Sequence, residues 1–218
     1  MIQKSAYIKF VVLFLLMTGL YGCTDHSNEP ANATENPNTT QDETTSEYTE
    51  ETTELPEGVA YIMEDGSSVL IDSLLKPVQT YNRICLTADA DSFTSVFPDE
   101  VIAFNLEAYD VETIADYASK LNSLYVQIYS NDFAMSNEYV ACSILSESQL
   151  EDFIQFYADN VGADIVPEYA FIVESEYTIT YTDEAGEEQS DCDTDYYIAY
   201  FYDGMMYLDY YYIDTLDL

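Results

Sequence analysis

The dipeptide Asp203-Gly204, placed between two tyrosine-rich alternating segments, constrains the fold of this 218-residue chain most strongly. A two-residue hairpin turn of this type needs positive φ at both positions, which Asp and Gly tolerate well. The turn therefore pairs Tyr202 with Met205 and fixes the register of the last two strands. Because the alternation begins earlier, at Phe171, we predict that the chain ends in an antiparallel β-meander.

This register assigns the residues of the hairpin to two faces. The predicted core face consists of Tyr197, Ala199, Phe201, Met206, Leu208 and Tyr210. The outer face presents flat rings with hydroxyls, which suit contact with a protein, peptide or glycan partner. Its candidate contact residues are Tyr196, Tyr200, Tyr202, Tyr207 and Tyr211. The alternatives are tyrosines that only form cross-strand pairs on a half-exposed sheet, or a homodimer that forms through this sheet.

Periodic apolar residues predict helices upstream of the meander. One pattern opens at Ser67-Ser68, a second starts at Pro98 with acids beside its N-terminus, and a third runs from Asp110 to Ile128. The end of the third also alternates like a strand. Residues 131–137 are predicted to be a loop and residues 138–145 a strand.

The clearest helix signal follows that strand. Ser148 and Glu151 match a capping box, in which each side chain binds a free backbone N–H of the other residue. An apolar stripe follows, and Gly162 supplies the C-terminal stop. Helices followed by an antiparallel meander predict the α+β class, with N-terminal helices packed on a bent sheet.

The beginning of the chain carries a predicted export and anchoring signal. Lys4 and Lys9 precede an apolar run from Phe10 to Met17, which is too short to span ~30 Å of hydrocarbon. The segment Leu20-Tyr-Gly-Cys23 resembles the lipobox of bacterial lipoproteins, whose cysteine is acylated, for example with palmitate. We therefore expect residues 1–22 to be a signal peptide. Lipid on Cys23 would then hold the protein on the outer side of the cell membrane.

Composition divides the remainder into two parts. Residues 23–58 comprise the anchor cysteine and a segment rich in Thr, Asn, Glu and Pro that has no Lys or Arg. Such a segment cannot bury enough apolar surface to offset chain entropy, so we predict a disordered acidic tether. Residues 59–218 are long enough for one domain with its own core.

The acidic excess restricts the possible partners and chemistry. With 42 acidic and 5 basic residues, the formal net charge is −37, which excludes nucleic-acid binding by electrostatic repulsion. The single histidine, His26, lies in the tether, so histidine-activated nucleophiles and histidine metal sites are also excluded. Cys85, Cys142 and Cys192 are widely spaced, which argues against a thiolate metal cluster and permits at most one internal disulfide.

One acidic run is a candidate calcium site. Asp191, Asp193 and Asp195 alternate along the chain and could offer several oxygens to one Ca²⁺. The EF-hand pattern would need Gly and Glu at positions that Tyr196 and Tyr202 occupy here. The alternative is an acidic lead-in to a hairpin on an acidic protein. No other cofactor is expected.

Three short motifs carry a family resemblance. The stretch from Asp91 to Ile102, with its Phe-Pro-x-Glu-Val-Ile ending, and the junction from Leu145 to Phe153 are similar to those of small lipoproteins from Gram-positive anaerobes. Tyr202-Asp-Gly-Met-Met-Tyr-Leu208 resembles their closing strand, with Met206 where Trp is usual. The resemblance implies a cone-shaped fold like that of nuclear transport factor 2 and ketosteroid isomerase, and it implies no reaction.

Three functions remain open on the sequence. The favoured one is a membrane-anchored, non-enzymatic binding or structural domain. An acid–base enzyme or small-ligand binder that uses the interior of the cone is the second, and an acid–tyrosine pair inside with shifted pKa values would favour the enzyme. A calcium-stabilised adhesion or scaffold module is the third.

Overall fold

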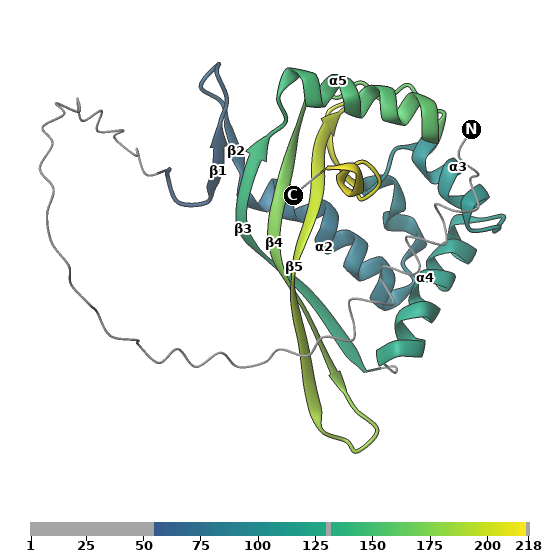
Figure 1. The fold of residues 1–218 in the computed structure, drawn as a ribbon. Helices are drawn as coiled ribbons and strands as arrows, with labels where there is room; N and C mark the ends of the chain where they lie inside the picture. The colour runs from purple at the N-terminus through teal and green to yellow at the C-terminus, as the bar shows by residue number, and fades with distance from the viewer. Residues whose placement is uncertain (1–54, 130–131, 217–218) are drawn as a thin grey trace, which may run out of the picture.

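The computed structural model describes residues 55–129 and 132–216. Residues 1–54, which include Cys23 and nearly all of the predicted tether, lie outside these ranges. The described part is α+β, as the sequence predicts. Its helices pack against a four-stranded antiparallel sheet that ends in a C-terminal meander (Figure 1).

The main sheet has the strand order β3-β4-β5-β6, and every neighbouring pair is antiparallel. The strands are β3 (Phe133–Ile144), β4 (Tyr169–Thr182), β5 (Glu188–Tyr202) and β6 (Met205–Asp209). A separate two-stranded sheet joins β1 (Val59–Ile62) to β2 (Ser68–Leu70). The long β4–β5 hairpin extends beyond the helices (Figure 1).

The turn that closes the meander confirms the predicted register. Tyr202 pairs with Met205, and Tyr200 pairs with Tyr207. Asp203 and Gly204 have φ values of 48° and 77°, as a two-residue turn with positive φ requires. The other edge of β6 is covered where Leu208 N–H donates to the carbonyl of Val96 at 3.0 Å.

The helices divide between the two faces of the sheet. The α-helices are α2 (Ile71–Thr87), α3 (Asp99–Ala108), α4 (Ile114–Tyr129) and α5 (Glu147–Phe156). The short helical segments are η2 (Ala90–Ser95), η3 (Tyr157–Val161) and η4 (Ile213–Thr215). On one face, the hydroxyl of Tyr197 donates to the α2 carbonyl of Leu74 at 3.2 Å. On the other, the ring of Tyr200 lies 5.2 Å from that of Phe153 in α5.

Four local predictions need correction. The pattern opening at Ser67-Ser68 is a short strand before the helix proper, and β3 already begins at Phe133 where a loop was predicted. The ambiguous stretch before Tyr129 is helical, as predicted, but this helix begins at Ile114 and not at Asp110. The capping box is formed by Ser146 and Gln149, whose side chain reaches back to the Ser146 N–H. Gly162 does end this helical region, with φ of 74°.

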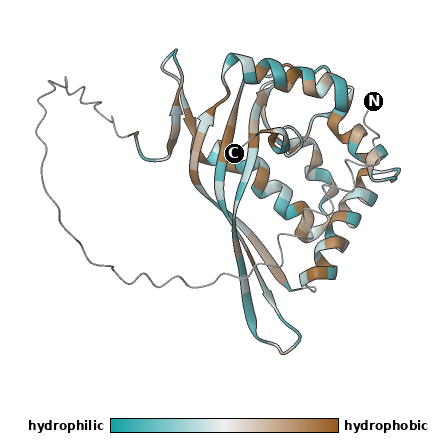
Figure 2. Ribbon diagram, viewed as in Figure 1, coloured by the Kyte–Doolittle hydropathy of each residue, from teal (hydrophilic) through white to brown (hydrophobic). Residues whose placement is uncertain are grey.

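Buried apolar residues lie on both faces of the sheet, where Tyr197 meets α2 and Tyr200 meets α5. Apolar residues concentrate on the packed parts of the strands and helices, whereas the protruding end of the β4–β5 hairpin is mostly hydrophilic (Figure 2). Among the largest fully buried side chains are Phe93, Phe153, Phe171 and Tyr197. No helix in the described ranges is both long enough and apolar enough to span a bilayer.

Candidate functional site

The predicted tyrosine contact face is not a continuous exposed surface. Tyr196 is 38% exposed, whereas Tyr200 is fully buried and Tyr207 is 8% exposed. The sequence prediction assumed that one face of the sheet is exposed to solvent. Instead α5 packs over this end of that face, and Phe153 and Tyr157 enclose the Tyr200 ring. The prediction of one partner-binding face therefore needs correction.

The two remaining tyrosines of that prediction lie apart from each other. Tyr202 is half-buried near the hairpin turn, with its ring 6.4 Å from that of Tyr207. Tyr211 follows β6 and lies in the C-terminal turn, where its hydroxyl donates to the side-chain oxygen of Asn105 on α3. Tyr202 and Tyr211 therefore lie in two different packing environments and do not belong to one surface.

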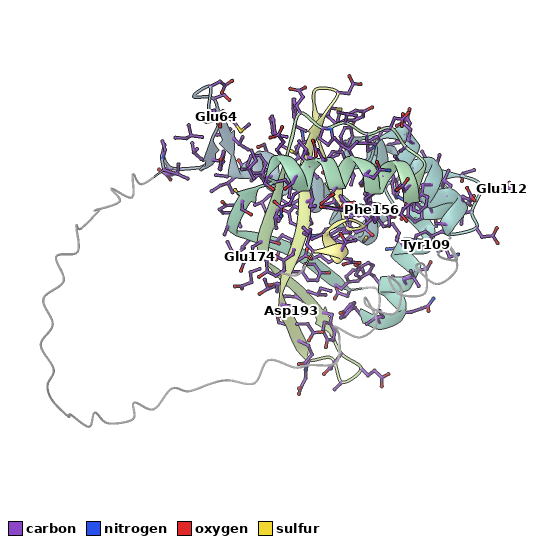
Figure 3. All side chains as sticks on the ribbon, turned by 45° about the horizontal axis from the view of Figure 1, so that its top comes forward. Glu64, Tyr109, Glu112, Phe156, Glu174 and Asp193 are labelled. Atoms are coloured by element: carbon purple, nitrogen blue, oxygen red, sulfur yellow. The ribbon has the colours of Figure 1, made fainter. Side chains whose placement is uncertain are left out.

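The three aspartates of the predicted calcium site are spread along β5. Alternate residues of a strand lie ~6.6 Å apart, so Asp191 and Asp195 are separated by roughly 13 Å along the chain. Asp193 lies on the hairpin (Figure 3). The described residues contain no group of three or more His, Cys, Asp or Glu side chains that could hold a metal ion. The strand conformation thus does not bring this ligand set together.

Asp195 instead belongs to a polar network inside the fold. We call it the Asp195 network, and its members are Asn82, Asn137, Ser175, Asp195 and Tyr210. Asp195 Oδ2 accepts from the Tyr210 hydroxyl at 3.0 Å and from Asn137 Nδ2 at 3.4 Å. Asn137 Nδ2 also donates to Ser175 Oγ at 2.8 Å, and its Oδ1 accepts from Asn82 Nδ2 at 2.7 Å.

Strand register explains why these residues meet. Asp195 lies directly opposite Ser175, and Ser175 lies directly opposite Tyr139. Asn137, two positions before Tyr139, therefore points to the same face. A bulge between Tyr139 and Ala141 then shifts the register of β3 by one residue. The network thus joins three adjacent strands to α2 and to the segment after β6.

Tyrosine side chains surround this network. The Tyr210 ring lies 5.9 Å from that of Tyr81 on α2 and 6.2 Å from that of Tyr197 on β5. Burial raises the pKa of Tyr210 and Tyr197 well above the ordinary value, and the charge of Asp195 raises both further. Burial likewise raises the pKa of Tyr125 on α4, with a smaller contribution from the charge of Asp195. These hydroxyls therefore stay protonated and act as hydrogen-bond donors.

The Asp195 carboxyl is itself perturbed. Burial raises its pKa to about 6, against the opposing effect of its hydrogen bonds from Tyr210 and Asn137. The neighbouring charge of Asp193 raises it further. Asp195 nevertheless keeps part of its surface accessible, as do Tyr81, Tyr177 and Tyr210. An enclosed carboxyl with a raised pKa is a feature typical of binding and acid–base sites.

A second aspartate–tyrosine pair has a structural role. Asp209 is fully buried and accepts from the Tyr157 hydroxyl at 2.6 Å. It also accepts from the backbone N–H groups of Tyr211 and Tyr212, at 3.0 and 2.9 Å. Burial raises the pKa of Asp209 to about 6. Because these donors surround the carboxyl and solvent does not reach it, Asp209 holds the C-terminal turn in place.

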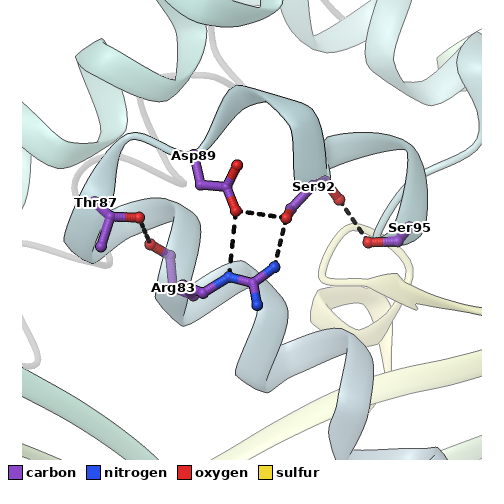
Figure 4. A network of polar contacts seen from close by, with 5 residues as sticks. All are labelled: Arg83, Thr87, Asp89, Ser92 and Ser95. Atoms are coloured by element: carbon purple, nitrogen blue, oxygen red, sulfur yellow. Dashed lines mark hydrogen bonds and ion pairs between the residues drawn. The ribbon is translucent and has the colours of Figure 1, made fainter.

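The basic side chains of the described ranges lie outside the Asp195 network. Arg83 forms an ion pair with Asp89 at 3.3 Å and also donates to Ser92, at the junction of α2 and η2 (Figure 4). Lys120 donates to the backbone carbonyl of Tyr109 at 2.7 Å, and Lys76 is exposed. None of the three is among the groups that chiefly set the pKa of the Asp195 carboxyl.

No disulfide joins the three described cysteines to one another. Cys85 is buried, and burial raises its pKa to about 12, so it stays protonated at neutral pH. Cys142 is half-buried and Cys192 is exposed. Cys85 therefore behaves as a small apolar residue of the core rather than as a nucleophile.

A surface cleft of about 270 Å³ lies beside the turn of the long β4–β5 hairpin, next to the start of β3. It is lined by residues 132–134 and 180–182 and by Glu188. Its acidic members, Asp132 and Glu188, are exposed. Exposed carboxylates stay hydrated, so this cleft offers less to a ligand than the enclosed carboxyl of Asp195.

Comparison with known proteins adds no functional assignment. No protein-family model, curated protein or solved structure matches the chain. The lipoprotein resemblance of the three short motifs is thus an expectation from the sequence alone. The site has to be argued from its own geometry.

Proposed function

We propose that this protein is a membrane-anchored lipoprotein outside the cytoplasm, and that its folded domain binds a ligand at the Asp195 network. The observation that carries the binding role is the half-buried Asp195, whose carboxyl accepts hydrogen bonds from Tyr210 and Asn137 and has a raised pKa. The location is inferred from Lys4, Lys9, the apolar run and the lipobox-like Leu20-Tyr-Gly-Cys23. Anionic headgroups would repel the acidic domain, so the domain would lie outside the membrane surface to which the lipid on Cys23 holds it.

Binding is favoured over catalysis by the direction of one hydrogen bond. Tyr210 donates its hydroxyl proton to the Asp195 carboxyl, so the most available acid and the most available base are bound to each other. A substrate would have to break this pair before either group could act on it. A ligand that only needs a fixed negative charge and aromatic walls can use the pair as it stands.

The anchoring half of the proposal is tested by acyl labelling. Cells that express the full chain would be fed an alkyne analogue of palmitate, and the protein would be tagged by click chemistry and fractionated. We expect label and membrane recovery for the wild type, and loss of both for Cys23→Ser. A Cys192→Ser variant is the matched control and should keep both. Unlabelled wild-type protein would contradict the anchor.

An acid–base enzyme is a second candidate, because the predicted criterion for it is met in part. Asp195 and Tyr210 form a close pair whose pKa values are both raised. A general base with a pKa of about 6 would work near neutral pH. Elimination of 5-nitrobenzisoxazole, which responds to any accessible carboxylate base, would detect it. A rate that is abolished by Asp195→Asn would favour the enzyme over the binding role.

A further inference from the structure

The main sheet has an open edge at β3. This strand is the outermost of the order β3-β4-β5-β6, and β4 is its only strand partner. β1 approaches the second half of β3, where the thiol of Cys142 donates to the carbonyl of Ala60 at 3.7 Å. Residues 133–139 form no backbone hydrogen bond with any described segment other than β4. This half of β3 therefore presents backbone N–H and C=O groups with which a further strand can pair.

The sequence of β3 lacks the usual protection of an edge strand. Such strands are commonly guarded by lysine, by proline or by a charge that points into the fold. β3 contains no Lys, Arg or Pro, and its single charged residue, Glu138, is exposed. The bulge between Tyr139 and Ala141 interrupts the strand only after this stretch. Residues 133–139 are therefore a regular edge that is available for pairing.

The outer face of the sheet beside this edge is acidic. We define the outer face as the side on which Glu138 lies, opposite the side that packs on α2. Glu138 lies directly opposite Glu176, and Glu174 follows two positions away on the same side of β4. Like charges that face each other across two strands destabilise a sheet. β3, β4 and β5 contain no basic residue, and those of the described ranges lie on α2 and α4. A cationic partner would offset this repulsion.

The cleft of about 270 Å³ lies at the start of the same edge. Ala134 contributes to its lining, together with the exposed acids Asp132 and Glu188. Ala134 and Glu138 lie on the same side of β3, roughly 13 Å apart along the strand. A strand added beside β3 would place two side chains, four positions apart, next to the cleft and next to Glu138. Lys or Arg at both positions would meet carboxylates at both ends.

The other side of the edge suits apolar residues. Phe133, Met135 and Tyr139 alternate with the residues of the outer face, and all three are half-buried. In an added strand, the side chains that lie opposite these three residues would cover apolar surface that is still exposed. The edge therefore matches a segment in which basic and apolar residues alternate.

We propose that residues 133–139 bind an extended segment of a partner protein in which Lys or Arg alternates with apolar residues, and that this segment adds a strand to the sheet. Main-chain hydrogen bonds supply most of the affinity, and the alternating side chains supply selectivity. The inference goes beyond the proposed function, because it uses the edge and the outer face, whereas Asp195 lies on the side that packs on α2.

Fluorescence anisotropy of the full chain in detergent tests the inference with three labelled heptapeptides. The first alternates Lys and Val with Lys at both ends, the second has Glu in place of Lys, and the third is the first with every backbone nitrogen methylated. We expect the first to bind at least about tenfold more tightly than either control, because the second loses charge complementarity and the third loses backbone hydrogen bonds. Equal binding of the first and third would mean attraction by charge alone and would overturn strand addition, as would failure of the first to bind.

Two double variants and hydrogen exchange locate the site. Glu138→Gln with Glu176→Gln should weaken the Lys peptide at least about threefold. Glu112→Gln with Glu151→Gln is the matched control, since it removes two exposed charges outside the sheet, and it should leave the affinity unchanged. An equal loss in both would mean a general charge effect and overturn the site. Backbone exchange of residues 133–139 should slow when the Lys peptide binds. If these amides are already protected because a second copy covers the edge, sedimentation will show a dimer and the proposal falls.

Discussion

Because Asp209 is buried, we predict an unusual pH dependence of the free energy of unfolding. The carboxyl is fully buried, and its pKa is raised from 3.8 to about 6 in the folded chain. The folded state therefore binds the proton more tightly than the unfolded state does. Stability is expected to be greatest below the unfolded pKa and to fall as pH rises towards the folded value. A shift of one pKa unit corresponds to ~1.4 kcal/mol of free energy. The ionisation of Asp209 should therefore lower the free energy of unfolding by about 3 kcal/mol.

Urea unfolding at several pH values between about 4 and 7 would measure this loss. Asp209→Asn removes the titrating group while keeping its shape, and its curve carries the same background from the other acidic residues. Over this pH range, the free energy of unfolding of the wild type should fall by about 3 kcal/mol more than that of Asp209→Asn. Curves that run parallel, or a wild type that gains stability over the variant as pH rises, would refute the reasoning.

Three further predictions concern the turn, the network and the thiols. Gly204→Ala should destabilise the chain by ~1 kcal/mol in thermal unfolding, because φ of 77° strains any residue with a Cβ; an unchanged melting temperature would contradict this. Asn82→Ala should cost about 1–3 kcal/mol by leaving a buried amide without its partner, whereas Asn160→Ala, which removes an exposed amide, should cost under about 0.5 kcal/mol. In peptide mapping after brief iodoacetamide treatment, Cys192 should be alkylated before Cys85, and the reverse order would refute the assigned burial.

Much of the fold could be predicted because local signals agreed with tertiary packing. The Asp203-Gly204 turn fixes its own backbone angles, and the alternation that begins at Phe171 coincides with β4. The failures came where a distant element decided the outcome. Tyr200 has the same local sequence pattern as an exposed strand tyrosine. It is buried only because α5, which is distant in the sequence, packs against it.

The site was harder to predict than the fold. Ser175 interrupts an otherwise apolar inner face of β4, which is a usable signal for a buried polar network, whereas Asp195 follows Asp191 and Asp193 on the same face of β5 and gave no such signal. Asn137 gave no such signal, because it lies in a stretch that reads as a loop, and its inward direction depends on strand pairing. Asn82 was hidden inside a helical pattern. The hydrogen bond between Asn82 and Asn137 joins residues 55 positions apart, and the sequence spacing of polar residues does not predict such a contact.

The most direct measurement of the central claim is the pKa of Asp195, followed by carboxyl carbon NMR over a pH titration. The account predicts a value of about 6, since burial opposes ionisation of this carboxyl. A value near 3.9, the ordinary value for an aspartate in water, would contradict the assignment of Asp195 as an enclosed carboxyl at a binding site.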